Sequence, residues 1–134
     1  MALQYSPALR DAQNDQIETV IGASPRAHIR SGPPPANTAA VDAGTLLVDI
    51  PLPADWLAAS ASGTKSKLGT WSATAIATGT AGHFRIKNSG ATLTHVQGTI
   101  TATGGGGDMT TDTIAINSGA VVSIDTFSVT RGNA

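Results

Sequence analysis

The sequence predicts a mainly β protein, an antiparallel β-sandwich or jelly roll of about seven or eight strands with one N-terminal α-helix. Residues 6–22 follow a helical period and carry a capping residue at each end. After residue 26, short runs of alternating apolar residues recur, separated by Gly, Pro and Asn. Regularly spaced short strands with turn residues between them are typical of antiparallel sandwiches.

The helix is expected from Pro7 to Ile21. Ser6 is a preferred N-cap, and proline is tolerated at the first helical position because its missing N–H would have no partner there. Gly22 suits the position after the last turn. The apolar positions form a narrow stripe, suited to packing on a sheet or on a neighbouring subunit. The stripe contains Leu9, Ala12, Ile17, Val20 and Ile21, with Arg10, Asp11, Asn14, Asp15 and Glu18 on the other side.

A short strand at 27–30 is expected to lead into an extended arm at 31–44. The arm begins Ser-Gly-Pro-Pro-Pro-Ala-Asn, and consecutive prolines cannot donate to a strand ladder. We therefore expect a polyproline-like segment with little reason to fold back on a small domain. A buried strand follows at 45–50, then one helical turn at 54–57 and a polar loop at 58–67.

Five further strands are expected, at 69–77, 82–87, 92–102, 113–116 and 121–130. The turn residues at 88–90 and 117–119 each predict a hairpin between the strands that flank them. The first hairpin would pair 83–87 with 93–97. The last strand changes its apolar phase between Ile124 and Phe127, which indicates a β-bulge or burial of both faces.

Composition limits the size of the core. A chain of 134 residues fits one domain, with a helix and turn at 1–25 and the sandwich, including the arm, at 26–134. Aromatic residues make up only 4% of the chain, so the core is thin and burial against neighbouring subunits would add stability. We expect Trp56 and Trp71 to anchor the core, although exposed tryptophans could also stack on sugars.

Several function classes are not favoured. The net charge of −1 offers no electrostatic footprint for nucleic acid or for an anionic membrane. No apolar run is long enough to span a bilayer. The N-terminal residues lack the basic start and apolar core of a signal peptide, so we expect synthesis in a cytoplasm.

No set of residues predicts catalysis. Alternation places His83 beside Arg85 and Lys87 on a face expected to be solvated, without an acidic residue in the same hairpin to complete a metal site. The glycine run before Asp108 lacks the following lysine and helix of a phosphate-binding loop, so we expect a flexible loop or a site of close backbone approach. The sequence therefore predicts no enzyme activity, metal, cofactor or small-molecule substrate.

Eight segments resemble one known family. They are ALQYS at 2–6, ETVIGASP at 18–25, IRSGPPPAN at 29–37, LPADW at 52–56, GTWS at 69–72, GTAGHFRI at 79–86, VQGT at 96–99 and TRGNA at 130–134. Over nearly its whole length the chain is similar to small virion structural proteins of tailed bacteriophages. The resemblance implies a phage structural protein, made in the host cytoplasm.

Small jelly-roll proteins of phages commonly decorate the head, so by analogy we expect a capsid decoration (cement) protein on the outer capsid surface. Its partners would be the major capsid protein and copies of itself, as a homodimer or homotrimer. The alternative is a tail-, neck- or fibre-associated structural protein or a receptor- or glycan-binding module. The residues expected to contact partners are Leu9, Ile17, Ile21, Pro33, Pro34, Pro35, Asn37, Gly105, Gly106 and Asp108.

Overall fold

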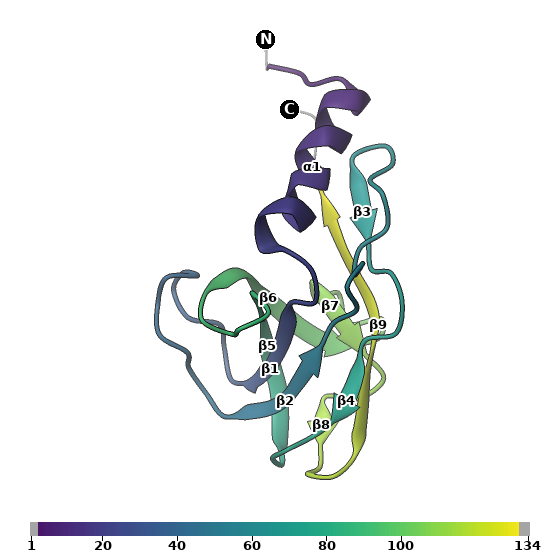
Figure 1. Ribbon diagram of the computed structural model, residues 1–134. Coiled ribbons are helices and arrows are strands. Elements are labelled where there is room, and N and C mark those ends of the chain that lie inside the picture. Colours follow the sequence, from purple (N-terminus) through teal and green to yellow (C-terminus); the bar gives the residue numbers. More distant parts are fainter. Residues whose placement is uncertain (1–2, 132–134) are drawn as a thin grey trace.

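The computed structural model describes residues 3–131 and has a mainly β fold, with one helix and a curled mixed sheet (Figure 1). Residues 1–2 and 132–134, which include the chain start and the outer ends of two segments behind the phage resemblance, lie outside the described residues. The elements are α1 (Pro7–Ile21), β1 (Arg26–Ser31), β2 (Leu46–Pro51), β3 (Thr64–Ser66), β4 (Ser72–Thr74), β5 (Gly79–Lys87), β6 (Thr94–Ala102), β7 (Met109–Thr111), β8 (Ala115–Ile116) and β9 (Val121–Thr130).

The strands follow the order β2-β1-β5-β6-β7-β9-β3, while β4 also pairs with β9 and β8 with β5. Because the sheet curls, β2 at one end of this order approaches the segment after β4, where Ile76 N–H donates to the Leu47 carbonyl over 2.8 Å. The helix rises from one end of the sheet beside β3 and the end of β9 (Figure 1). The molecule therefore has a body, the curled sheet, and a projecting end built around α1.

Aromatic side chains form the centre of the core, as predicted. Trp56 and Trp71 are both buried, with ring centroids 6.0 Å apart. Phe127 lies 5.5 Å from Trp71 and meets Phe84 edge to face at 5.6 Å. Edge-to-face and tilted ring pairs add to the free energy gained by burying the rings themselves. Four large rings thus supply much of the volume that the many small side chains cannot.

The predicted helix is confirmed at both ends. The Ser6 hydroxyl accepts a hydrogen bond from Leu9 N–H over 3.2 Å, and proline occupies the first turn. At the other end, Gly22 has a φ of +90° and donates to the Glu18 carbonyl over 2.8 Å. A left-handed residue at this position lets the chain leave the helix while an end carbonyl stays satisfied.

Two β features were also predicted correctly. Strands β5 and β6 form the expected antiparallel hairpin, but 83–87 pair with 94–99 and not with the predicted 93–97, so that Arg85 lies opposite Gln97. Thr110 of β7 pairs with Thr126 of β9, but the next residue of β7, Thr111, pairs with Ile124. The extra residue of β9 between these pairs is a β-bulge, which returns the apolar side chains to the core face after the phase change.

Other β predictions are wrong where pairing is not local. Residues 117–119 do not close a hairpin, because β8 pairs with β5 and β9 pairs with other strands. Residues 54–57 form no helical turn, and the expected loop at 58–67 contains β3. Most of 69–77 is irregular, with only β4 as a strand. Strand β7 was not predicted, and its pairing with β6 is parallel.

The arm at 31–44 folds back on its own sheet, contrary to the sequence prediction. Arg85 on β5 donates to the backbone carbonyls of Asn37, Thr38 and Ala40 over 2.9–3.3 Å. Gln97 on β6 donates to the Pro35 carbonyl over 2.8 Å. An extended segment offers few internal partners for its carbonyls, and the buried Arg85 of β5 and the half-buried Gln97 of β6 supply donors to them.

The arm also explains a second wrong prediction. The face of β5 expected to be solvated is buried at His83, Arg85 and Lys87. Alternation correctly placed these side chains on the face opposite Phe84. It could not show that another segment of the chain would cover that face.

Candidate functional site

The polar side of α1 attaches the helix to the body. Asp11 accepts a hydrogen bond from Gly63 N–H over 2.7 Å, and the Glu18 carboxylate accepts one from Leu57 N–H, also over 2.7 Å. Between them, the fully buried Asn14 donates to the Gly63 carbonyl over 2.7 Å. These contacts satisfy backbone groups of the segment 57–63 that make few ladder bonds of their own. The polar side of the helix therefore faces the segment 57–63, with its carboxylates at the edge of the contact.

Lys65 lies at the centre of this contact with only 1% of its surface exposed. Its ammonium is 2.9 Å from Asp15 and 3.3 Å from Glu18. Burial acts to lower the pKa of Lys65, but hydrogen bonds to the two carboxylates outweigh it and raise the pKa above the ordinary value. The hydrogen bond from Lys65, aided by one from Ser60 N–H, lowers the pKa of Asp15. The charged form of each partner is thus the stable one.

The opposite side of α1 is uncharged and faces solvent. Leu9 is 46% exposed and Val20 is 68% exposed, and Gln13 and Gln16 lie on the same side at helical spacing. An amphipathic helix on a globular protein ordinarily turns its apolar side to the core. Here Asn14 and Glu18 turn toward the body while Leu9 and Val20 stay exposed, although Ile17 and Ile21 still pack against the core.

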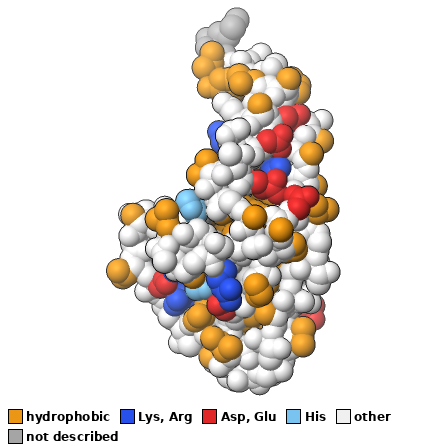
Figure 2. All heavy atoms as spheres, in the orientation of Figure 1, with side chains coloured by type: hydrophobic (Ala, Val, Ile, Leu, Met, Phe, Trp, Pro, Cys, Tyr) orange, Lys and Arg blue, Asp and Glu red, His pale blue; other side chains and the backbone are white. Residues whose placement is uncertain are grey.

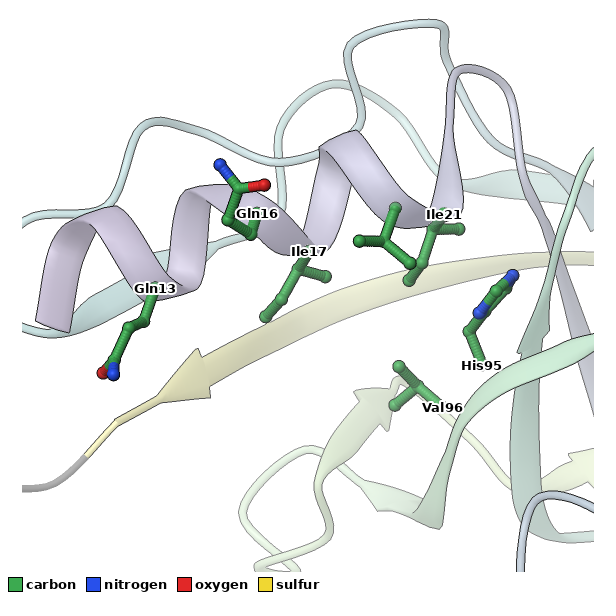
Figure 3. Close-up of a pocket in the computed structure, with 7 residues that line it drawn as sticks. Gln13, Gln16, Ile17, Ile21, His95 and Val96 are labelled. Atoms are coloured by element: carbon green, nitrogen blue, oxygen red, sulfur yellow. The ribbon is translucent and has the colours of Figure 1, made fainter.

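A groove runs between this outer side and β6 (Figure 3). Its volume is about 270 Å³. Ile17 and Ile21 point from the helix toward His95 and Val96, which rise from β6 (Figure 3). We call the outer side of α1 and this groove the α1 surface; its residues are Leu9, Gln13, Gln16, Ile17, Val20, Ile21, His95 and Val96.

The structure separates the three helix residues predicted to contact partners. Leu9 is exposed and Ile17 is half-buried at the groove, so both are accessible. Ile21 is buried and belongs to the core, so it lies at the base of the groove and not on an open surface. Val20 is the most exposed large apolar residue of the helix. It belongs to the predicted apolar stripe but is not one of the residues predicted to contact partners.

The contact residues predicted on the arm do not extend away from the molecule. Pro33 and Asn37 are exposed, whereas Pro34 and Pro35 are half-buried. The Asn37 and Pro35 carbonyls bind Arg85 and Gln97 of the same chain. These residues hold the arm to the sheet through their backbone carbonyls. Only their outward-facing side chains are left to contact another molecule.

The glycine run closes the turn between β6 and β7. Gly106 has a φ of +83°, and a Cβ on Gly105 would lie 2.8 Å from the Thr101 side chain. Asp108 accepts hydrogen bonds from both the backbone N–H and the hydroxyl of Thr99. Gly105, Gly106 and Asp108 are exposed, but their contacts are those of a tight turn in which backbone approaches the sheet closely.

The three histidines have different surroundings. His83 Nδ1 is 2.9 Å from the Gly32 carbonyl, His28 Nε2 is 3.4 Å from Asp49, and His95 borders the groove. Burial lowers the pKa of His28, although the charge of Asp49 acts to raise it. Within residues 3–131, no group of three or more His, Asp or Glu side chains is placed to hold a metal ion.

In the described part of the chain, no helix is long and apolar enough to cross a membrane. No family model matches this chain, and no curated protein or solved structure was found to be similar to it.

Proposed function

We propose that this protein is a structural subunit of a tailed-phage virion, a capsid decoration (cement) protein that binds the major capsid lattice and associates with copies of itself. We also propose that the curled sheet is a variant of the jelly roll, in which the β6–β7 pair is parallel and not antiparallel. The observation that carries the proposed function is the outer side of α1, where the apolar side chains of Leu9 and Val20 lie open to solvent without a charged neighbour on that side of the helix.

The α1 surface fits a second copy of the same surface. Leu9 and Val20 would gain free energy by leaving water, and a charged partner would have to bury its charge without a counter-ion. The same surface of another copy carries no such charge. A symmetric contact would place the apolar positions of one helix against those of the other, and the glutamines could hydrogen-bond at its edge.

Self-association suits a cementing role. An oligomer presents several lattice-binding surfaces at once, so weak individual contacts add to firm attachment. A protein that binds the assembled lattice preferentially stabilises that lattice by mass action. The thin core predicted from composition is consistent with a chain that gains part of its stability from neighbours.

A glycan-binding module has less support. Such a module needs exposed aromatic rings on which sugars can stack, and Trp56 and Trp71 are both buried in the core. A tail, neck or fibre location stays as the alternative within the structural class.

Copy number per virion tests the location. We expect hundreds of copies, in a simple ratio to the major capsid protein, in quantitative mass spectrometry of purified particles. Particles that lack the protein should lose resistance to heat and low salt. A few dozen copies or fewer, or particles of unchanged resistance, would contradict the decoration role and favour the tail, neck or fibre.

Sedimentation of the purified chain tests whether the α1 surface mediates self-association. We expect Val20→Glu to shift the protein toward monomer, because a carboxylate would be buried in the contact. Val121→Glu is a matched control, since Val121 is 72% exposed and begins β9, away from α1. A wild-type chain that is monomeric at all concentrations, or a Val20→Glu variant that associates like the wild type, would remove this surface from the proposal.

A further inference from the structure

Half of the cationic side chains of the protein gather on one face of the sheet. Four of its eight Lys and Arg residues meet only two of its nine Asp and Glu residues there. We call this group the cationic cluster; it consists of Arg26, Arg30, Arg85, Lys87, Asp42 and Asp49. Its net charge is +2, although the whole chain carries −1. Figure 2 shows basic, histidine and acidic side chains gathered over β1 and β2, well separated from the acidic side chains along α1.

One carboxylate forms ion pairs with three of these cations. Asp42, on the arm, lies 2.6 Å from Arg85, 2.7 Å from Lys87 and 3.1 Å from Arg30. Partial burial acts to raise the pKa of Asp42, but hydrogen bonds from Lys87 and Arg85, with the charge of Arg30, lower it to about 2. A single negative charge cannot neutralise three positive ones, and these are poorly solvated. The side chain of Arg85 is 1% exposed and that of Lys87 is 10% exposed.

Lys87 is the cation with the least compensation. Arg85 also has three backbone carbonyls of the arm as acceptors. Lys87 donates only to Asp42 among residues 3–131, and an ammonium has three donors. The buried Nε atoms of Arg30 and Arg85 likewise have no acceptor within the described residues. A buried cation without sufficient counter-charge is costly, so the cluster is short of an anion.

A notch gives access to Lys87. It lies between the arm and the β5–β6 hairpin and has a volume of about 380 Å³. Arg85 and Lys87 line it together with Thr92 and Thr94, which bring hydroxyls. Val41, 87% exposed, and Leu93, 55% exposed, are its large apolar residues on the arm and on the hairpin.

We propose that this notch binds a carboxylate side chain from an acidic segment of a partner protein, which becomes the second acceptor of Lys87 beside Asp42. The cations already hold one carboxylate in suitable geometry, and a second would halve the excess charge. The apolar walls fit the methylene groups of a Glu or Asp side chain and its neighbours. A nucleic acid fits less well, because its charges extend far beyond the notch, where the rest of the chain carries a net −3 and would repel them; a short acidic segment can place its charge in the notch itself.

Titration of the isolated, full-length chain with a blocked tetraglutamate peptide tests this site. At constant ionic strength we expect shifts of the backbone amide signals of residues 92–94 in the ¹⁵N NMR spectrum, with no shifts from blocked tetraglutamine. Lys87→Gln should weaken tetraglutamate binding about tenfold, the effect of one lost charge-assisted hydrogen bond. Arg131→Gln removes the same charge at an exposed position outside the notch and should change binding less than twofold.

Asp42→Asn provides a test in the opposite direction. It removes the internal competitor, so tetraglutamate binding should become several-fold tighter although the arm is held less firmly. Equal binding by wild type, Lys87→Gln and Asp42→Asn would overturn the proposal. So would binding of inorganic phosphate or of a DNA duplex at the same residues without binding of tetraglutamate.

Discussion

The two segments that pack against the sheet, α1 and the arm at 31–44, are both held by polar contacts, but the charge balance of the two contacts is opposite. At α1, two carboxylates, those of Asp15 and Glu18, meet one buried lysine, and Asp11 binds a backbone N–H on the same side of the helix; Asp15 is about half exposed, so water solvates the excess negative charge. At the arm, cations are in excess and the central guanidinium is buried. An excess that water solvates is stable by itself, whereas a buried excess needs a counter-ion.

The two contacts leave two different kinds of surface open to solvent. At the α1 contact the buried ammonium has two carboxylates as partners, so what the helix leaves open is its apolar outer side, which suits self-association. The arm contact is incomplete, so what it leaves open is a cationic notch, which suits an acidic partner. One small domain can therefore offer different surfaces to copies of itself and to another protein.

Removal of the buried guanidinium should have the largest effect. Arg85→Leu leaves three arm carbonyls without this donor and removes one of the three cations that hold Asp42, so we expect a loss of about 3 kcal/mol in the free energy of unfolding. Urea unfolding measures it, and hydrogen exchange should show the arm amides exposed. Arg131→Leu, which replaces an exposed arginine, should stay within about 0.5 kcal/mol of the wild type. An equally small loss for Arg85→Leu would mean that the arm contributes nothing to stability.

Breaking the α1 contact should cost somewhat less. Lys65→Met removes the counter-ion of Asp15 and Glu18, but both carboxylates can reach water, so we expect a loss of about 2 kcal/mol. The helix amides should exchange faster while those of β5 keep their protection. If all amides lose protection together, α1 and the sheet unfold as one unit, and the two contacts are not independent.

Acid should act on the arm through Asp42. Its pKa is about 2 in the folded protein and about 3.8 as an ordinary aspartate. As the pH falls, Asp42 therefore binds a proton in the unfolded chain before it does so in the folded protein. The stability that the charged Asp42 provides above pH 4 is lost as the pH falls toward 2. We expect this group to account for roughly 1 to 2 kcal/mol. The difference in unfolding free energy between wild type and Asp42→Asn should shrink over that range; a constant difference would contradict the assignment.

The smallest effect should come from His28. Burial lowers its pKa below 6.5, with Lys87 and Arg30 acting in the same direction and Asp49 and Asp42 against it. Because the unfolded chain binds this proton more readily, stability should decline as the pH falls from 6.5 through the lowered folded value. His28→Gln should remove that part of the decline. An unchanged pH profile in the variant would show that another group titrates there.

Local sequence determined much of this protein. The bounds of α1 follow from its capping residues, the β5–β6 hairpin from its turn residues, and the bulge in β9 from a change of apolar phase. The burial of Trp56 and Trp71 follows from the scarcity of other large side chains. Each of these features depends on residues close in the chain or on the size of one side chain.

Tertiary structure decided which face of each segment points inward. The periodicity of α1 defines a polar and an apolar side, but Lys65 and the backbone of 57–63 make the polar side the inner one, and they are distant in sequence. The arm folds back because Arg85 and Gln97, more than forty residues away, take its carbonyls. The helical period predicted Leu9 and Ile17 of the α1 surface, but the long-range contacts decided that this side stays open; the cationic notch arises from long-range contacts alone, and no local pattern predicted it.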